Sequence, residues 1–112
     1  HGKLVQEGIT LLDAEHLIPL KARAWLDLSA RRQEGQPVDS KSILKHRNDV
    51  ARLFQLLEPT ANLEVPRLIA GDMARFLQAM SAETLNLKDL GIHGLDWTTF
   101  LEQLNRVYFG EH

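Results

Sequence analysis

Residues 17 to 28 read Leu17-Ile-Pro-Leu-Lys21-Ala-Arg-Ala-Trp25-Leu-Asp-Leu28, and their spacing decides the fold of this chain. Apolar side chains recur every three or four residues, the period at which one face of an α-helix is buried. On a helical wheel Lys21 falls between Leu17 and Trp25, inside that apolar face. Because an ammonium group is costly to bury without a partner, we expect Lys21 either to reach solvent or to meet an anion.

This pattern predicts a first helix that begins at Asp13, an N-cap residue, and ends near Arg32. The same reasoning predicts a second helix from Asp39 or Ser40 to before Pro59, a third from about Pro66, and a last one from Gly94 or Asp96 to near Gly110. The expected core faces of these three helices are Ile43, Val50, Leu53, Phe54 and Leu57; Ile69, Met73, Phe76, Leu77 and Met80; and Trp97, Phe100, Leu101, Leu104 and Val107.

Two short apolar pieces flank Gly8 within residues 3 to 12 and predict a small β-hairpin. The segment 83 to 93 fits no single element. The expected fold is therefore mainly α, a compact bundle of about four helices with a short N-terminal β-hairpin.

Composition places the chain among ordinary globular proteins. A length of 112 residues suits one helical domain over residues 1–112, and the 44% hydrophobic and 25% charged contents fit neither disorder nor a membrane protein. The net charge of −2 gives no overall attraction to nucleic acid or anionic lipid. The absence of cysteine and of a secretory signal pattern predicts a cytoplasmic location and no membrane contact.

The second helix repeats the anomaly of the first. His46 and Arg47 fall on its apolar face beside Val50, and Asp49 lies at the border. If the two apolar faces pack together, Lys21 joins His46, Arg47 and Asp49 at one polar spot. Spacing alone favours a purely structural polar cluster. The functional alternative is an anion site in which these cations receive phosphate oxygens while Asp49 orients one of them.

The motifs of several enzyme classes are missing. The chain has no glycine-rich phosphate loop, no His-Glu-x-x-His zinc motif and no nucleophile elbow. Its histidines lack ligand spacing, so we expect no metal site; they are His1, His16, His46, His93 and His112. No catalytic residue is predicted, and a free-standing enzyme is the least favoured interpretation.

Residues 17–27, with their lysine at position 21, precede Asp39-Ser-Lys41 and the segment Lys45-His-Arg-Asn-Asp49-Val-Ala-Arg-Leu53. Over residues 9 to 57 this arrangement resembles the C-terminal half of nucleotidyltransferase-like proteins, in particular the AbiEii toxin family of abortive-infection systems. In that family a lysine-bearing helix precedes a helix with the pattern Lys-Asp-x-x-Asp-hydrophobic-x-x-Leu. Lys45, Asp49 and the two apolar positions match this pattern, whereas His46 stands where the family commonly has aspartate.

The resemblance implies a helical domain that packs against a catalytic domain of the polymerase-β type and helps to bind a nucleoside triphosphate. It places Lys21 near the phosphates, with Lys45 and Asp49 supporting that contact and His46 and Arg47 as further candidates. The family's metal-binding half carries a Gly-Ser turn and an Asp-x-Asp pair, which this chain lacks. We therefore expect Mg²⁺ and nucleotide chemistry only in an intact protein of which this chain is the C-terminal fragment, inactive alone.

Two other functions remain open. A helical module that binds an antitoxin-like or other protein partner would use large aromatic anchors near the C-terminus, although completion of the core is the favoured role for them. Those anchors are Trp97, Phe100, Tyr108 and Phe109. RNA binding would use the basic side chains of the second helix, of which three lie opposite its apolar face as a solvated stripe. The four basic residues considered are Lys41, Lys45, Arg47 and Arg52, and all but Arg47 belong to that stripe.

Overall fold

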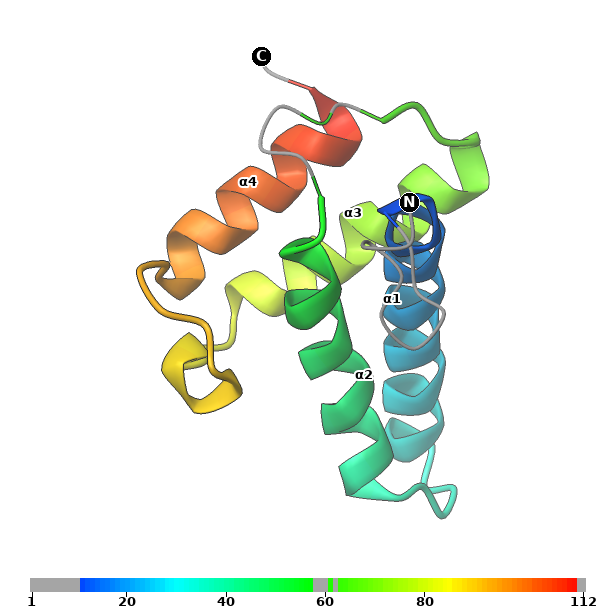
Figure 1. The fold of residues 1–112 in the computed structure, drawn as a ribbon. Coiled ribbons are helices and arrows are strands. Elements are labelled where there is room, and N and C mark those ends of the chain that lie inside the picture. Colours follow the sequence, from blue (N-terminus) through cyan, green and yellow to red (C-terminus); the bar gives the residue numbers. More distant parts are fainter. Residues whose placement is uncertain (1–10, 58–60, 62, 111–112) are drawn as a thin grey trace.

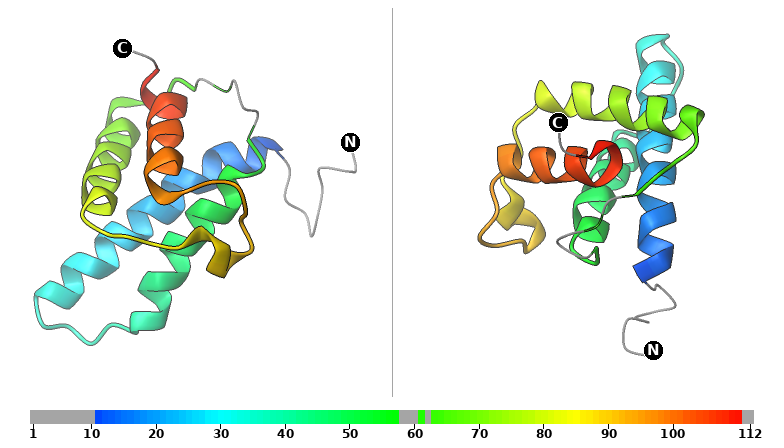
Figure 2. Two further views of the ribbon diagram at one scale, coloured as in Figure 1. Left: turned by 90° about the vertical axis from the view of Figure 1, so that its left-hand side faces the viewer. Right: turned by 90° about the horizontal axis from the view of Figure 1, so that it is seen from above.

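The computed structural model describes residues 11–57, 61 and 63–110, which contain four α-helices and one short 3₁₀ helix (Figure 1). In chain order these are α1 (Leu11–Gln33), α2 (Ser40–Phe54), α3 (Arg67–Ser81), η1 (Leu87–Leu90) and α4 (Trp97–Phe109). Helices α1 and α2 form an antiparallel hairpin, and α3 and α4 lie side by side across it (Figure 2). None of the helices in this part of the chain combines the length and apolar composition that a bilayer-spanning segment requires.

Local capping explains where two of the helices begin. The carboxylate of Asp39 accepts the backbone N–H of Lys41 at 3.0 Å, and that of Asp96 accepts the N–H of Thr99 at 2.7 Å. Each satisfies an amide that the first turn of a helix leaves unpaired. Gly110 follows the last residue of α4 with a φ of 74°, a conformation that suits glycine. The starts predicted for the second and last helices are confirmed.

One hydrophobic core joins all four helices. The Trp25 ring of α1 meets Phe76 of α3 edge to face, with 5.7 Å between the ring centroids. Trp97 is almost wholly buried and donates its indole N–H to the carbonyl of Met80 at 3.2 Å, which connects α4 to the end of α3. The buried members of the predicted core faces are Ile43, Val50, Leu53, Leu57, Met73, Phe76, Met80, Trp97, Phe100, Leu104 and Val107; Phe54, Ile69, Leu77 and Leu101 are partly buried.

Most of the N-terminal hairpin predicted over residues 3 to 12 lies outside the described residues, and its last two residues are helical. Leu11 and Leu12 belong to α1, which begins two residues before the expected Asp13, and residues 1–10 lie outside the described part of the chain. Leucine has a high helix propensity, so a Leu-Leu pair extends a helix readily. The ambiguous segment 83 to 93 contains η1, whose start is capped by the side chain of Asn86.

Helix α1 continues through Pro19, a residue that usually interrupts a helix. Proline has no N–H, so the carbonyl of Glu15, four residues earlier, loses its helical donor. The hydroxyl of Tyr108 donates to this carbonyl at 3.0 Å, which fastens the end of α4 to the start of α1. Burial, with a smaller contribution from the charge of Glu15, raises the pKa of Tyr108 and keeps the hydroxyl protonated as a donor.

We predict that Tyr108→Phe lowers the free energy of unfolding by about 1–3 kcal/mol, because the Glu15 carbonyl is then left without a partner. In a Pro19→Ala background the loss should be smaller, since the N–H of residue 19 can then bond to Glu15. Urea unfolding of the four proteins of this double-mutant cycle measures the difference. An equal loss in both backgrounds would show that the proline does not create the need for Tyr108.

Candidate functional site

Lys21 meets an anion. Its ammonium nitrogen lies 3.0 Å from Oδ2 of Asp49, which α2 presents across the helical hairpin. The two side chains are only 26% and 18% exposed, so this ion pair is partly shielded from water. Of the two outcomes expected for this lysine, the structure shows the pairing.

Asp49 also receives two cations from its own helix. Lys45, one turn earlier, places its ammonium nitrogen 3.0 Å from Oδ2, and Nη1 of Arg52 lies 3.8 Å from Oδ1. Both cationic side chains are more than half exposed. Lys21, Lys45, Asp49 and Arg52, which we call the cationic cluster, thus hold three positive charges against one negative charge.

The structure adds to one interpretation of the sequence. Lys45 and Arg52 were expected to form a solvated stripe with Lys41, opposite the apolar face. Both side chains are more than half exposed, as expected, and their long flexible stems also bring both charged ends to Asp49. Lys41 is exposed and makes no side-chain ion pair among the described residues.

The charge state of Asp49 follows from competing influences. Burial acts to raise its pKa, but the hydrogen bonds and positive charges of Lys21 and Lys45 outweigh burial and lower the pKa below the usual range of a carboxyl group. A depressed pKa in the folded state means that the ionised carboxylate stabilises the fold at neutral pH. That contribution is lost as the pH falls from the ordinary aspartate pKa through the lowered one.

We predict that Asp49→Asn lowers the free energy of unfolding by about 1–2 kcal/mol at neutral pH, because three cations then surround a neutral amide. The difference from the wild type should shrink in strong acid, where Asp49 is itself protonated. Denaturant unfolding at both pH values checks this, with Asp89→Asn on the exposed surface as the matched control. An equal effect of the two substitutions would rule out a special role of the cluster.

His46 lies next to the cationic cluster. Burial is the main cause that lowers its pKa, the charges of Lys21 and Lys45 add to this effect, and Asp49 opposes it. Its Nδ1 atom is buried and has no hydrogen-bond partner in the described part of the chain. The unfolded chain therefore protonates His46 more readily than the folded chain does. The free energy of unfolding falls as the pH drops from about 6.5, the ordinary histidine pKa, through the lowered value.

We predict that Lys21→Met raises the pKa of His46, because one of the charges that disfavour the imidazolium is removed. An NMR titration of the imidazole resonances measures the change. Lys88→Met removes a charge from an exposed lysine of η1 and should leave the pKa of His46 unaltered. An unchanged pKa in Lys21→Met would contradict the electrostatic proximity of the two side chains.

Arg47 does not join the cluster, and the prediction that it would is wrong. Its Nη1 donates to Oε1 of Glu83 at 3.1 Å, and its Nε donates to the side chain of Asn48 at 3.2 Å. The guanidinium therefore connects α2 to the segment that follows α3. The carboxylate of Glu83 comes from a residue 36 positions away, so helical spacing within α2 gave no indication of it.

The sequence did not lead us to predict a second ionic cluster, which surrounds Asp72. Asp72 of α3 is only 8% exposed and pairs with Arg75 of its own helix and with Arg23 of α1, whose Nη1 lies 3.6 Å away. The sign in the sequence was an acidic residue between Ile69 and Met73, inside the apolar face of the third helix. This cluster holds α1 against α3 as the cationic cluster holds α1 against α2.

The cationic cluster does not suit a magnesium ion. Mg²⁺ prefers several oxygen ligands, and here a single carboxylate is already surrounded by three cationic groups. Within the residues that the structure describes, no three acidic or histidine side chains come together as a metal site would require. The arrangement instead suits an anion that can share the ammonium and guanidinium donors.

Comparison of the chain with protein-family models, with curated proteins and with solved structures finds no match. The likeness to nucleotidyltransferase-like proteins therefore depends only on the sequence segments 17–27, 39–41 and 45–53. The geometry brings together Lys21, Lys45 and Asp49, places His46 beside them and leaves Arg47 outside.

Proposed function

We propose that the cationic cluster binds the phosphate groups of a nucleoside triphosphate, within a nucleotidyltransferase-like protein whose catalytic cleft this helical domain caps. The observation that carries the proposal is the convergence of three cations from two helices on a single carboxylate. The excess of positive charge is local, since the whole chain carries a net charge of −2.

The three cationic side chains differ in exposure, and we therefore propose different roles for them in phosphate binding. Lys45 and Arg52 are 65% and 54% exposed, so their charged ends can turn toward a phosphate with little cost in packing. Lys21 is held between the helices by Asp49 and supplies a fixed charge. Several charge-assisted donors around one oxygen-rich group are what phosphate recognition requires, and the guanidinium of Arg52 can engage two oxygens at once.

Asp49 serves as the organiser of this site. Without its carboxylate, the ammonium groups of Lys21 and Lys45 would repel each other at their present positions. His46 lies beside this site with a lowered pKa, so at physiological pH its neutral ring adds no further positive charge. None of these groups is arranged as a nucleophile with a general base, so the domain binds and positions while the transfer chemistry belongs to other residues.

We predict that the 112-residue chain binds ATP and does not bind adenosine, since phosphate provides the contacts. Lys21→Met and the double variant Lys45→Met/Arg52→Met should each weaken ATP binding by about tenfold or more, a loss of roughly 1.4 kcal/mol. Lys41→Met is the matched control, because this exposed lysine of α2 does not contact Asp49. Isothermal titration calorimetry gives the affinities.

A second readout separates phosphate binding from a change in folding. Bound triphosphate adds negative charge beside His46 and should raise the pKa of that residue in an NMR titration. ATP affinity that is equal in the wild type, Lys21→Met and the double variant would overturn the proposed function. If Lys41→Met lost as much ATP affinity as the cluster variants, the loss would be explained by the change in net charge and not by the cationic cluster.

The two other functions considered from the sequence gain less from the geometry. None of the aromatic side chains considered as anchors projects freely into solvent, because Trp97, Phe100 and Tyr108 are buried and Phe109 is partly buried. The basic side chains considered for RNA do not share one surface, because Arg47 is only 14% exposed and pairs with Glu83.

A further inference from the structure

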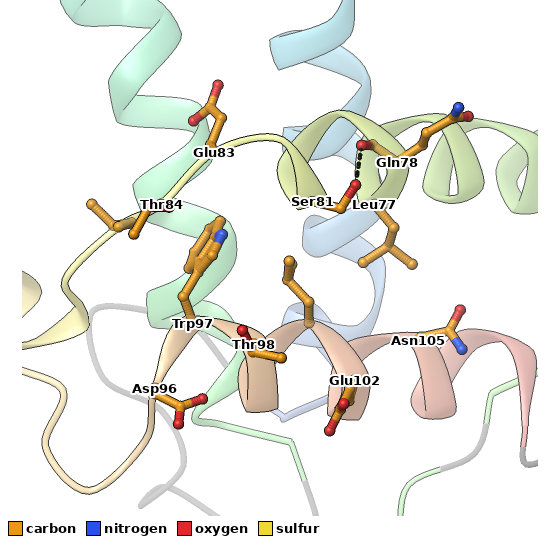
Figure 3. Close-up of a pocket in the computed structure, with 12 residues that line it drawn as sticks. Leu77, Gln78, Ser81, Glu83, Thr84, Asp96, Trp97, Thr98, Glu102 and Asn105 are labelled. Carbon is orange, nitrogen blue, oxygen red and sulfur yellow. Dashed lines mark hydrogen bonds between the residues drawn. The ribbon is translucent and has the colours of Figure 1, made fainter.

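A groove with a volume of about 860 Å³ runs along the seam between α3 and α4. Figure 3 shows it from the side opposite the α1–α2 hairpin, whose helices pass behind it. None of its lining residues belongs to α1 or α2, so it is separate from the cationic cluster. We call it the α3–α4 groove.

Apolar side chains form part of the surface of the α3–α4 groove, and the other lining residues are polar or acidic. Leu77 of α3 and Trp97 of α4 point into the space between the two helices (Figure 3), and Leu85 and Leu101 also line it. A smaller hollow of about 290 Å³ continues along the same seam and shares Leu77 with it. The seam follows the 13 residues of α4, a length of roughly 20 Å, which equals between three and four helical turns.

The rim of the groove carries charge of one sign. Every charged residue that lines it is acidic: Glu83, Asp96 and Glu102. Glu83 is paired with Arg47, whereas Asp96 and Glu102 are exposed and make no ion pair among the described residues. The α4 side of the groove therefore presents negative charge beside apolar side chains, and the groove shares no residue with the cationic cluster.

We propose that the α3–α4 groove binds an amphipathic helix of a protein partner, with apolar side chains in the groove and lysine or arginine beside Asp96 and Glu102. An amphipathic helix of between three and four turns has the length of the seam and can present apolar residues at i, i+3 or i+4, and i+7. Its basic residues complement the rim, which disfavours acidic peptides and nucleic acid. Gln78, Ser81 and Asn105 provide polar groups at the edges for hydrogen bonds.

The test uses the full 112-residue chain and two synthetic peptides of about 14 residues, the length that spans the seam. One peptide is an amphipathic helix of leucine and lysine, and the other replaces every lysine with glutamate. The Leu/Lys peptide should bind in a one-to-one complex, at least about tenfold more tightly than the Leu/Glu peptide. Fluorescence anisotropy of labelled peptides gives the affinities.

Matched variants locate the binding surface. Glu102→Lys and Leu101→Ala should each weaken the Leu/Lys peptide by about fivefold or more, a loss of roughly 1 kcal/mol. Glu64→Lys makes the same charge change at an exposed residue that does not line the groove, and should have little effect. Both groove variants should keep the ATP affinity of the wild type, because the cationic cluster is untouched.

Three results would overturn the proposal. The first is that neither peptide binds. The second is that Glu64→Lys weakens binding as much as Glu102→Lys, which would indicate attraction by net charge alone. The third is a concentration-dependent dimer that Leu101→Ala abolishes, which would assign the groove to a second copy of this chain.

Discussion

The burial of one face of α1 is the constraint on which the rest of the structure depends. Ala14, Ile18, Ala22 and Trp25 are almost completely buried, and the two small alanines let neighbouring helices approach closely. Three polar groups of α1, of which the Arg23 side chain is exposed, each pair with a group on a different helix. Lys21 pairs with Asp49 of α2, Arg23 with Asp72 of α3, and the Glu15 carbonyl with Tyr108 of α4. The apolar face brings the helices together, and the polar contacts select how each one is placed.

The distribution of charge separates two surfaces that the composition conceals. A chain with a net charge of −2 has no obvious affinity for anions, yet the hairpin of α1 and α2 gathers three cations around Asp49. The α3–α4 groove is lined by other residues, and all the charged ones among them are acidic. A phosphate ligand and a basic helical partner would thus occupy different places, and binding of one need not exclude the other.

Several features could be read from the sequence because they depend on short-range rules. Apolar periodicity marked the four helices and most of their buried residues, and Asp39 and Asp96 marked two helix starts through capping. The misfit of Lys21 in an apolar face pointed to an anionic partner, and Asp49 was among the candidates. The contacts that the sequence did not predict concern long, flexible or distant groups: Arg47 pairs with Glu83, and the exposed side chain of Arg52 reaches back to Asp49. The role of Pro19 was missed because its consequence appears only where Tyr108 reaches α1.

The sequence by itself determined where the helices lie, which faces are apolar and which polar residues interrupt those faces, since these properties follow from the order of side chains along a helix. Only the tertiary structure decided which charges meet, because an ion pair needs two atoms within a few ångströms and helical spacing specifies only one helix at a time. The α3–α4 groove is likewise a product of packing. Neither helix contains it, and it exists because α3 and α4, which residues 82–96 connect, lie side by side.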